Sequence, residues 1–278
     1  MNQLYFGDNL FILKNLYNEY PNGFIDLIYI DPPFNSKRNY NVLFESIDLT
    51  DSTAQKEAFA DTWSNISYLD TLNELADLDL HLFNFLNNLD NIGISKGAIS
   101  YLTTMSIRIW YMHKLLKDTG SFYLHCDSTM SHYLKILCDL IFGEKNFRNE
   151  IIWCYTAPTN TKDNFPKKHD IILRYTKSNK WSFNYEDISI PYSEETIART
   201  GRGSGNQGLY GTKNPEEKHA NRLKPMGKIP EDWWLISRLQ GNSVEKLGYP
   251  TQKPEDLLER IIKASSNEND LEIGRAHV

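Results

Sequence analysis

Apolar positions along the chain follow two different spacings, which predict alternating strands and helices. Largely apolar runs over residues 24–30, 121–126 and 169–176 predict buried strands. Between the first two runs, apolar residues over 99–117 recur at helical intervals, which predicts a helix that Gly120 should end. A strand, a helix and a second strand in this order predict a parallel sheet of the α/β class.

Weaker signals add elements around these. A short strand is predicted over 4–6, and Asp8 or Asn9 should cap the helix that follows. Leucines over 72–89 predict one or two helices, and the aromatic stretch 232–236 should return the chain to the core. Two further helix starts are predicted: Asp127-Ser128 before a helix over about 129–142, and Pro254 before an amphipathic helix with Leu257, Leu258, Ile261 and Ile262.

A polar, glycine-containing segment between 181 and 228 shows no persistent helical or strand periodicity. Its basic side chains could neutralise phosphates, and Asn206 or Gln207 could read adenine edges. We therefore interpret it as a DNA-recognition segment with four candidate phosphate contacts: Arg199, Arg202, Lys213 and Arg222. Its glycines do not form a dinucleotide- or phosphate-binding motif, because no strand precedes them and no apolar helix follows.

Composition narrows the class of protein. A chain of 278 residues that is 40% hydrophobic can bury a sizeable core, as one large domain with a smaller insertion or as two domains. We find no membrane-spanning apolar run and no signal sequence, so we expect a cytoplasmic protein. Cys126, Cys138 and Cys154 lie too far apart for a metal or redox motif, and no metal is predicted. The net charge of −6 argues against a uniformly basic nucleic-acid-binding surface.

The chemistry is concentrated after the first predicted strand, where the chain reads Asp31-Pro32-Pro33-Phe34. The carboxyl ends of strands form the usual ligand-binding edge of open α/β sheets. Asp31 and the carbonyl of Pro32 could accept the two hydrogens of an exocyclic amine, while Phe34 could stack on the base that carries it. Taken alone, an Asp-Pro-Pro sequence can equally be an acidic turn.

The region after this tetrapeptide is long, and from about residue 45 to 98 it is acidic. Long insertions inside a domain are usually functional or mobile. At the start of this region, Lys37 and Arg38 are placed to reach DNA phosphate or to close over a bound base. Simple solvation explains these two charges equally well.

The tetrapeptide resembles the catalytic motif of the amino-group DNA methyltransferases, and its Asp-Pro-Pro-Phe form is similar to the branch that methylates adenine N6. Cytosine-N4 enzymes more often carry Ser at the position of Asp31, so that branch is the alternative. Two further runs resemble motifs that line the target-base pocket in the family: residues 120–127 and 147–153. From the residues alone, His125 and Asp127 are interpreted as a core histidine and a helix cap rather than an acid–base pair.

The resemblance also implies a cofactor, S-adenosylmethionine. Gly7-Asp8-Asn9-Leu10 resembles the segment whose acid binds the adenine part of the cofactor, although a helix cap is the default role of Asp8. Thr251-Gln252-Lys253-Pro254 resembles the segment that holds the methionine carboxylate. Thr251, Lys253 and the start of a helix suit that anion.

The order of these motifs resembles that of the circularly permuted β class over about residues 3–271. That class implies a Rossmann-like S-adenosylmethionine-dependent methyltransferase sheet with an inserted DNA-recognition segment. We expect a catalytic core over 1–178, including the acidic insertion of about 45–98. A target-recognition segment over 179–235 and a cofactor-side helix that returns to the core over 236–271 should follow.

The last residues, 272–278, are expected to be a non-native tail, because they can be back-translated as the start of a common sequencing-adapter read-through. In the β class, a strand and an Asp-Pro-Phe-x-Gly-x-Gly cofactor loop follow the Thr-Gln-Lys-Pro helix. We find neither in this sequence, so we expect the fold to be incomplete at its C-terminus, with the edge of a central strand exposed. We also expect this polypeptide alone to bind S-adenosylmethionine poorly.

The resemblance implies a site-specific DNA methyltransferase that acts on adenine N6 in double-stranded DNA. It extends to modification subunits of restriction systems, which implies a nuclease subunit as a partner. Three alternatives remain: cytosine-N4 DNA methylation, methylation of RNA or of protein glutamine, and an inactive DNA-binding fragment that lacks the cofactor loop.

Overall fold

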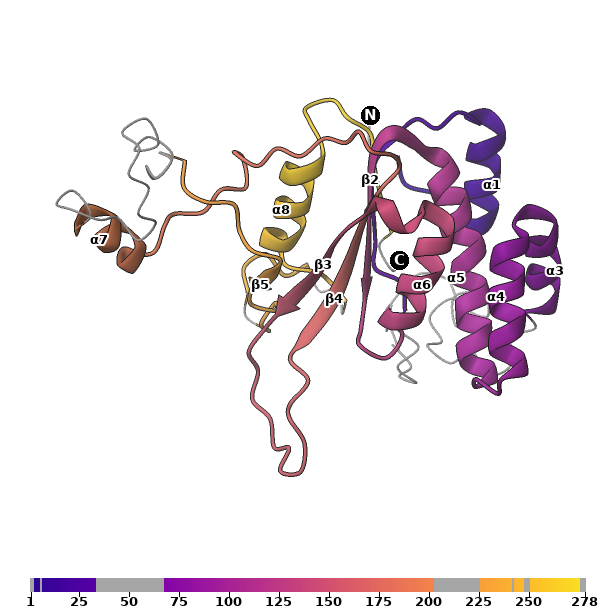
Figure 1. Ribbon diagram of the computed structural model, residues 1–278, viewed down its shortest axis with the longest axis horizontal. Helices are drawn as coiled ribbons and strands as arrows, with labels where there is room; N and C mark the ends of the chain where they lie inside the picture. The colour runs from indigo at the N-terminus through magenta and orange to yellow at the C-terminus, as the bar shows by residue number, and fades with distance from the viewer. Residues whose placement is uncertain are drawn as a thin grey trace, which may run out of the picture.

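The computed structural model describes residues 3–5, 7–33, 68–202, 226–241, 243–247 and 251–275. Strands within these ranges form one six-stranded sheet in the order β5-β3-β4-β2-β1-β6 (Figure 1). The strands are β1 Ile25–Ile30, β2 Leu116–Cys126, β3 Phe147–Cys154, β4 His169–Thr176, β5 Trp233–Leu235 and β6 Glu272–Arg275. The helices are α1 Asn9–Glu19, α3 Leu69–Leu78, α4 Leu80–Asn91, α5 Lys96–Leu115, α6 Ser131–Phe142, α7 Glu194–Arg202 and α8 Glu255–Ser265, with a 3-10 helix over Glu144–Asn146. The expected α/β class is confirmed.

The strand directions determine which chain segments meet at each edge of the sheet. β1 runs parallel to both β2 and β6, as expected for the strand–helix–strand order of β1, α5 and β2. β4 runs antiparallel to its neighbours β2 and β3, and β5 is parallel to β3. The carboxyl ends of β1, β2, β3 and β6 therefore lie at one edge of the sheet, together with the beginning of β4.

Side chains alternate between the two faces of the sheet, and each face packs on its own set of helices. Ile28 and Phe122 belong to the larger buried cluster, which includes residues of α1 and of α3 to α6. Leu27 and Tyr123, one residue away along the same strands, belong to the cluster that includes Leu257 of α8. Figure 1 shows α8 on the opposite side of the sheet from α5 and α6.

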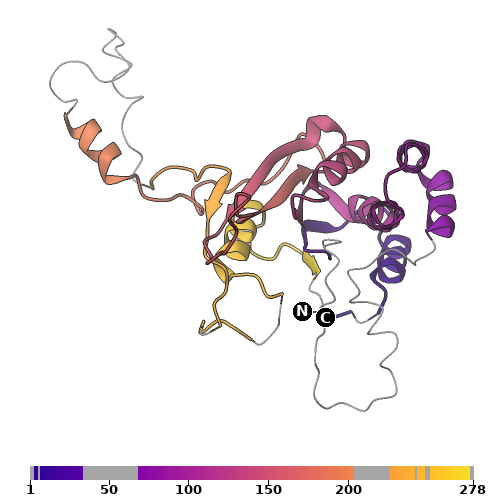
Figure 2. The same cartoon turned by 90° about the horizontal axis from the view of Figure 1, so that it is seen from below.

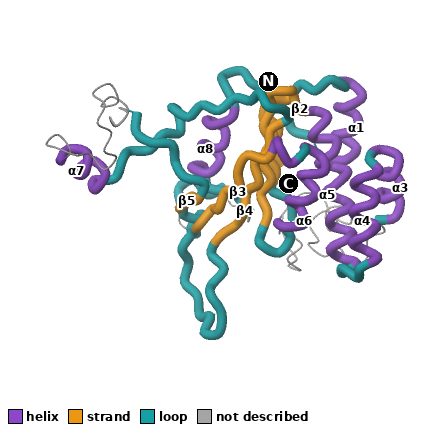
Figure 3. Tube along the Cα trace, viewed as in Figure 1, coloured by secondary structure: helices purple, strands orange, loops and turns teal. Residues whose placement is uncertain are grey.

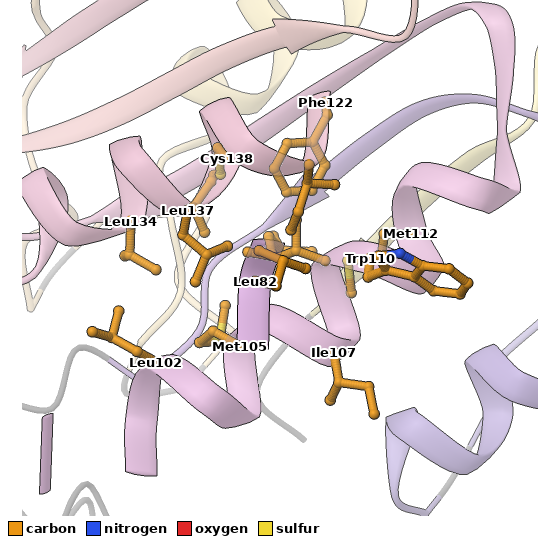
Figure 4. Packing of buried hydrophobic residues seen from close by; sticks show 14 of the residues in the cluster. Leu82, Leu102, Met105, Ile107, Trp110, Met112, Phe122, Leu134, Leu137 and Cys138 are labelled. Carbon is orange, nitrogen blue, oxygen red and sulfur yellow. The ribbon is translucent and has the colours of Figure 1, made fainter. Parts of the chain in front are cut away.

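The last part of the acidic insertion is a helical layer of the core. The leucines expected to form one or two helices form α3 and α4, which confirms that prediction. Leu82 of α4, Leu102 of α5 and Leu137 of α6 are each completely buried, and Figure 4 shows them in one cluster with Phe122 of β2. Burying each such side chain contributes about 1.5–3 kcal/mol, so the three helices form one stable layer.

The predicted end of the long helix was wrong. Gly120 does not end a helix; α5 ends at Leu115 and β2 begins at once with Leu116. The pairing of β1 with β2 is irregular between Ile25 and Leu27, and a Cβ atom on Gly120 would lie 3.1 Å from the carbonyl oxygen of Ile25. The same atom would lie 2.8 Å from Leu116 Cδ2 and 3.0 Å from the Lys117 carbonyl oxygen, so glycine relieves crowding both within β2 and against β1.

Two other predicted elements differ from the structure. Leu4 and Tyr5 are exposed and belong to no strand, because no described strand pairs with them, while Phe6 lies outside the described residues. The segment expected to lack periodicity contains α7, which stands away from the sheet in Figures 1 and 2. The return to the core over 232–236 is confirmed, since β5 joins the sheet and Trp234 is buried.

The expectation that no strand follows the last helix was also wrong. Glu272–Arg275 forms β6, which pairs in parallel with β1 from Leu27 to Ile30. Ile273 packs against the larger cluster, and the Ser266 hydroxyl donates to Glu272 Oε1 at 2.5 Å. β6 therefore covers the edge of β1 that the sequence led us to expect exposed. The domain boundaries and the non-native origin of 272–278 stay predictions.

Candidate active site

Asp31 follows β1 directly and lies at the edge of the sheet where the parallel strands end. Its side chain is largely buried, with the residue 6% exposed, and Pro32 beside it is also buried. Neither Pro32 nor Pro33 has an N–H group, so neither can extend the ladder of β1. The predicted position of these residues at the strand end is confirmed, and Phe34 lies outside the described residues.

Lys253 lies against this carboxylate. Its ammonium forms an ion pair with Asp31 Oδ2 and donates to the carbonyl oxygen of Thr251 at 3.3 Å. The Lys253 and Asp31 side chains are only 14% and 8% exposed, so water screens the pair weakly. The structure thus brings together the predicted catalytic acid and the two residues predicted to bind the cofactor carboxylate.

The N-terminus of α8 lies directly after Lys253 and already binds a carboxylate. Pro254 occupies the N-cap position and supplies no side-chain cap. Glu245 does so instead, since its Oε2 accepts from the backbone N–H of Glu255 at 3.1 Å. Gln252 ties the two segments together by donating to the carbonyl oxygen of Glu245 at 2.7 Å. The helix start is therefore an anion-binding position, as its dipole and open N–H groups predict.

A buried hydrogen-bonded network lies behind Asp31, centred on His125 of β2, which has no exposed surface. The Nδ1 atom of His125 lies 3.0 Å from the Tyr29 hydroxyl, and its Nε2 lies 3.3 Å from Asp170 Oδ2. The Tyr155 hydroxyl donates to Asp170 Oδ1 at 3.2 Å. Asp170 reaches this edge because β4 begins where the antiparallel β2 ends.

Burial and neighbouring charges shift the pKa values of the groups around His125. Burial alone would raise the pKa of Asp170, but its hydrogen bond and charge interaction with His125, followed by the charge of Arg238, lower it overall. Burial, with the charges of Asp31 and Asp170, raises the pKa of Tyr29, so its hydroxyl keeps its proton. The two ring nitrogens of His125 thus lie between the Tyr29 hydroxyl on one side and the Asp170 carboxylate on the other. Asp31 Oδ1, 3.4 Å from Nδ1, accepts no hydrogen bond from the described residues.

Asp8 caps α1, as expected. Its Oδ1 accepts from the backbone N–H of Leu10 at 2.9 Å and lies 3.0 Å from Nη2 of Arg108 in α5. Arg108 also donates to Asn9 Oδ1 at 2.7 Å. Burial lowers the pKa of Arg108, and the charge of Asp8 opposes that shift. The Asp8 side chain is still 62% exposed, and its role toward a cofactor stays a prediction.

Most of the predicted DNA contacts cannot be placed. Lys37, Arg38, Lys213 and Arg222 lie outside the described residues. Arg199 and Arg202 lie in α7, of which only the backbone is described at these two positions. Their roles in DNA binding therefore stay predictions.

Three residues of the buried network were missed by sequence reasoning: Tyr29, Tyr155 and Asp170. An acid near the start of an otherwise apolar strand was the one available signal for Asp170. His125 was interpreted correctly as a buried histidine. The predicted cap was wrong: α6 begins at Ser131 with Met130 at its N-cap and no side-chain cap, and Asp127 Oδ1 accepts from the backbone N–H of Thr129 at 3.0 Å in the turn before the helix. Sequence reasoning did not show that His125 lies beside Asp31.

A separate cavity of about 760 Å³ lies between α8 and the loop after β5, with Arg238, Glu259 and Arg260 in its lining. Asp31 and Lys253 do not line it. Its lining mixes cations and carboxylates without an unpaired buried polar atom among the described residues, so we place the candidate site at Asp31. The described part of the chain contains no group of His, Cys, Asp and Glu side chains arranged to hold a metal. None of its helices is long and apolar enough to cross a membrane.

Comparison with known proteins gives a consistent family. The Mod subunit of the type III restriction-modification enzyme EcoP15I from Escherichia coli is 28% identical over 187 residues, which are 66% of this chain and 26% of that protein. The chain thus spans about a quarter of that subunit. DNA adenine methyltransferase YhdJ from Escherichia coli strain K12 is 26% identical over 267 residues, 95% of this chain and 67% of that protein.

Among solved structures, the M1.HpyAVI–SAM complex is similar with a TM-score of 0.46 and 16% identity, covering 99% of this chain and 83% of that one. A family model described as DNA methylase, of the N6/N4 type, matches residues 25–272. That range contains Asp31, His125, Asp170 and Lys253, and it is most of the chain. The chain therefore belongs to the N6/N4 DNA methylase family.

Proposed function

We propose that this protein transfers a methyl group from S-adenosylmethionine to adenine N6 in double-stranded DNA. The observation that carries the proposal is Asp31 Oδ1, a buried carboxylate oxygen that accepts no hydrogen bond from the described residues. A buried acceptor without a donor is costly unless a ligand supplies one. An exocyclic amine is such a ligand, and it is the group that this family methylates.

In this proposal the target adenine leaves the duplex and its amino group meets the end of β1. Asp31 Oδ1 and the carbonyl of Pro32 accept the two N6 hydrogens, and Phe34 stacks on the ring. Holding both hydrogens localises the nitrogen lone pair and orients it. Asp31 acts by position and charge, because the amino proton becomes acidic only after the methyl group has been attached; that proton then leaves through the Asp31 carboxylate to water.

The residues around Asp31 suit the proposed cofactor. S-adenosylmethionine, when bound, supplies an electrophilic methyl group and a thioether leaving group. Its carboxylate matches the start of α8, where the Glu245 carboxylate already accepts the backbone N–H of Glu255. Lys253 and Thr251 stand beside this position, and Lys253 supplies a cation. Asp8, which remains largely exposed at its helix cap, is the proposed partner of the adenine part.

The proposal is tested by expressing the native reading frame that contains this chain in a host without DNA adenine methylation. Mass spectrometry of nucleosides from digested genomic DNA should detect N6-methyladenine. Asp31→Ala should abolish it while duplex binding by the purified protein is kept, and the exposed Asp77→Asn in α3 serves as the matched control. Detection of N4-methylcytosine instead would replace adenine by cytosine as the target. Absence of both modified bases would overturn the proposal.

We further propose that the protein is the modification component of a restriction system. This rests on similarity to a protein named as a type III Mod subunit, with which the chain shares 28% identity over 187 residues. The expected partners are double-stranded DNA and a nuclease subunit. Co-expression with the neighbouring open reading frames and affinity purification should recover a nuclease in a fixed ratio. Recovery of the methyltransferase alone would contradict this partner.

A further inference from the structure

The connection between β3 and β4 projects well beyond the sheet, as Figures 1 and 3 show. β3 ends at Cys154 and β4 begins at His169, and the backbone N–H of Tyr155 donates to the Lys168 carbonyl at 3.0 Å. Every residue from 156 to 167 is exposed. We call these twelve residues the finger. Exposed chain of this length that covers no part of the core needs another explanation than packing.

The finger projects from the edge of the sheet that carries the candidate active site. β3 and β1 run in the same direction, because β4 is antiparallel to β3 and to β2, and β2 is parallel to β1. Cys154 at the end of β3 and Asp31 after β1 are therefore at the same edge. Six residues in each arm of a hairpin span about 20 Å, well over the depth of either DNA groove.

The finger carries the chemistry of a nucleic-acid contact. Phe165, which follows the bend over residues 162–164 in the returning arm, is 98% exposed, which is unusual for a side chain of this size. Lys162 and Lys167 provide positive charge, against the single acid Asp163. The remaining residues are mainly Thr, Asn and Pro, which leave Phe165 as the one large apolar group. A lone aromatic group among cations and amides suits insertion between bases better than docking on a protein, which would need a larger apolar surface.

Local contacts restrict the finger before it binds anything. The hydroxyls of Thr159 and Thr161 are 2.9 Å apart, and the Lys168 ammonium donates to the Pro158 carbonyl at 3.5 Å. Pro158 and Pro166 each fix one φ angle. Each of these restraints reduces the conformational entropy that the finger loses on binding.

We propose that the finger enters duplex DNA beside the target base, with Phe165 wedged between neighbouring bases and Lys162 and Lys167 on the flanking phosphates. This rests on the proposed function, because the partner is the substrate of the same site. A base that leaves the stack opens a gap, and an aromatic side chain that fills the gap holds the opened duplex. The finger thus promotes base flipping and contributes affinity that depends little on sequence.

The proposal is tested by fluorescence anisotropy with the full chain and labelled duplexes of arbitrary sequence, one fully matched and one with a single mispaired adenine. Phe165→Ala should weaken binding to the mispaired duplex about 5- to 50-fold, since one base–aromatic stack is lost. Phe165→Trp should retain the affinity and show indole quenching on binding. The matched control is Leu80→Ala, which shortens a 60% exposed side chain at the start of α4.

The two lysines are tested by the salt dependence of binding. Lys162→Ala combined with Lys167→Ala should reduce the slope of log K against log salt by about 2, because each lysine neutralises one phosphate. Lys145→Ala, at the opposite end of β3, should leave the slope unchanged. If the parent protein binds DNA and the finger variants keep its affinity and its salt slope, the role proposed for the finger is wrong, while the proposed function still stands. Failure of the parent to bind any duplex would overturn the proposed function as well.

Discussion

The ammonium of Lys253 is paired with the carboxylate of Asp31, although 222 residues separate them along the chain. The contact joins the end of β1, where the target base is proposed to bind, to the segment before α8, where the cofactor carboxylate is proposed to bind. It engages one oxygen of Asp31 and leaves Oδ1 without a hydrogen-bond donor among the described residues. Lys253 can therefore orient Asp31 without occupying the oxygen that is proposed to receive the amino group.

The first prediction is that these two charges are energetically coupled. Asp31→Asn leaves the Lys253 ammonium without its anionic partner, and Lys253→Met leaves the Asp31 carboxylate without its cationic partner. In both variants the remaining charge lies in a site that is mostly closed to water. Each single change should lower the free energy of unfolding by about 1–3 kcal/mol. The double variant should lose less than the sum, because neither charge then remains unpaired. Urea denaturation of all four proteins measures the coupling, and strictly additive losses would show that the pair is absent in solution.

Sequence patterns predicted the parts of this site that depend on single elements. The apolar run of β1 and the two prolines placed Asp31 at a strand end, and the spacing of Leu257 and Ile261 placed Lys253 before a helix. Local patterns could not show that Asp170 meets His125, because that contact depends on β4 running antiparallel beside β2. Nor could they assign Gly120, since glycine both ends helices and allows close strand approach.

The second prediction concerns the turn that leads into β1. Gly23 has a φ of +78°, and a Cβ atom there would lie 2.2 Å from the carbonyl oxygen of Leu116. Gly23→Ala combines backbone strain with a clash against backbone and should lower the free energy of unfolding by about 2–4 kcal/mol. Gly97→Ala is the control, because it lies in α5 with open space around it and should be stabilising by about 0.4–1 kcal/mol. Chemical denaturation should give shifts of opposite sign.

The third prediction is a loss of stability on acidification that depends on His113. Burial, followed by the charges of Lys177 and Lys114, lowers the pKa of His113 from 6.5 to about 3. Lys177, whose pKa is lowered to about 8, stays charged below pH 6.5 and donates to the His113 carbonyl. Between pH 6.5 and 3 the unfolded chain therefore binds a proton that the folded chain does not. Stability from this group is fully present above pH 6.5 and is lost as the pH falls.

The loss can approach 1.4 kcal/mol for each pH unit within that window. His113→Phe removes the titration and can keep the edge-to-face contact with Phe142, whose ring centre lies 4.7 Å away. The unfolding free energy of this variant should therefore fall less steeply than that of the parent between pH 6.5 and 4. Parallel curves for the two proteins would contradict the assignment to His113.

The last prediction concerns β6, which lies beside the strand that carries Asp31. A protein that ends after Leu271 would lack Glu272–Arg275 but keep the hydrogen bond from Asp26 N–H to the Leu271 carbonyl, 2.9 Å long. β1 would then be an edge strand that has lost its pairing with β6 from Leu27 to Ile30, apart from the Leu27 N–H, which still donates to the Leu271 carbonyl at 3.3 Å. We expect the free energy of unfolding to fall by about 2–4 kcal/mol, since several net hydrogen bonds of about 1 kcal/mol are lost, and light scattering to show association. The control ends after Arg275 and keeps all of β6. Equal stability and solubility of the two shortened proteins would show that β6 contributes nothing, and the edge of β1 would then have to be protected by other residues.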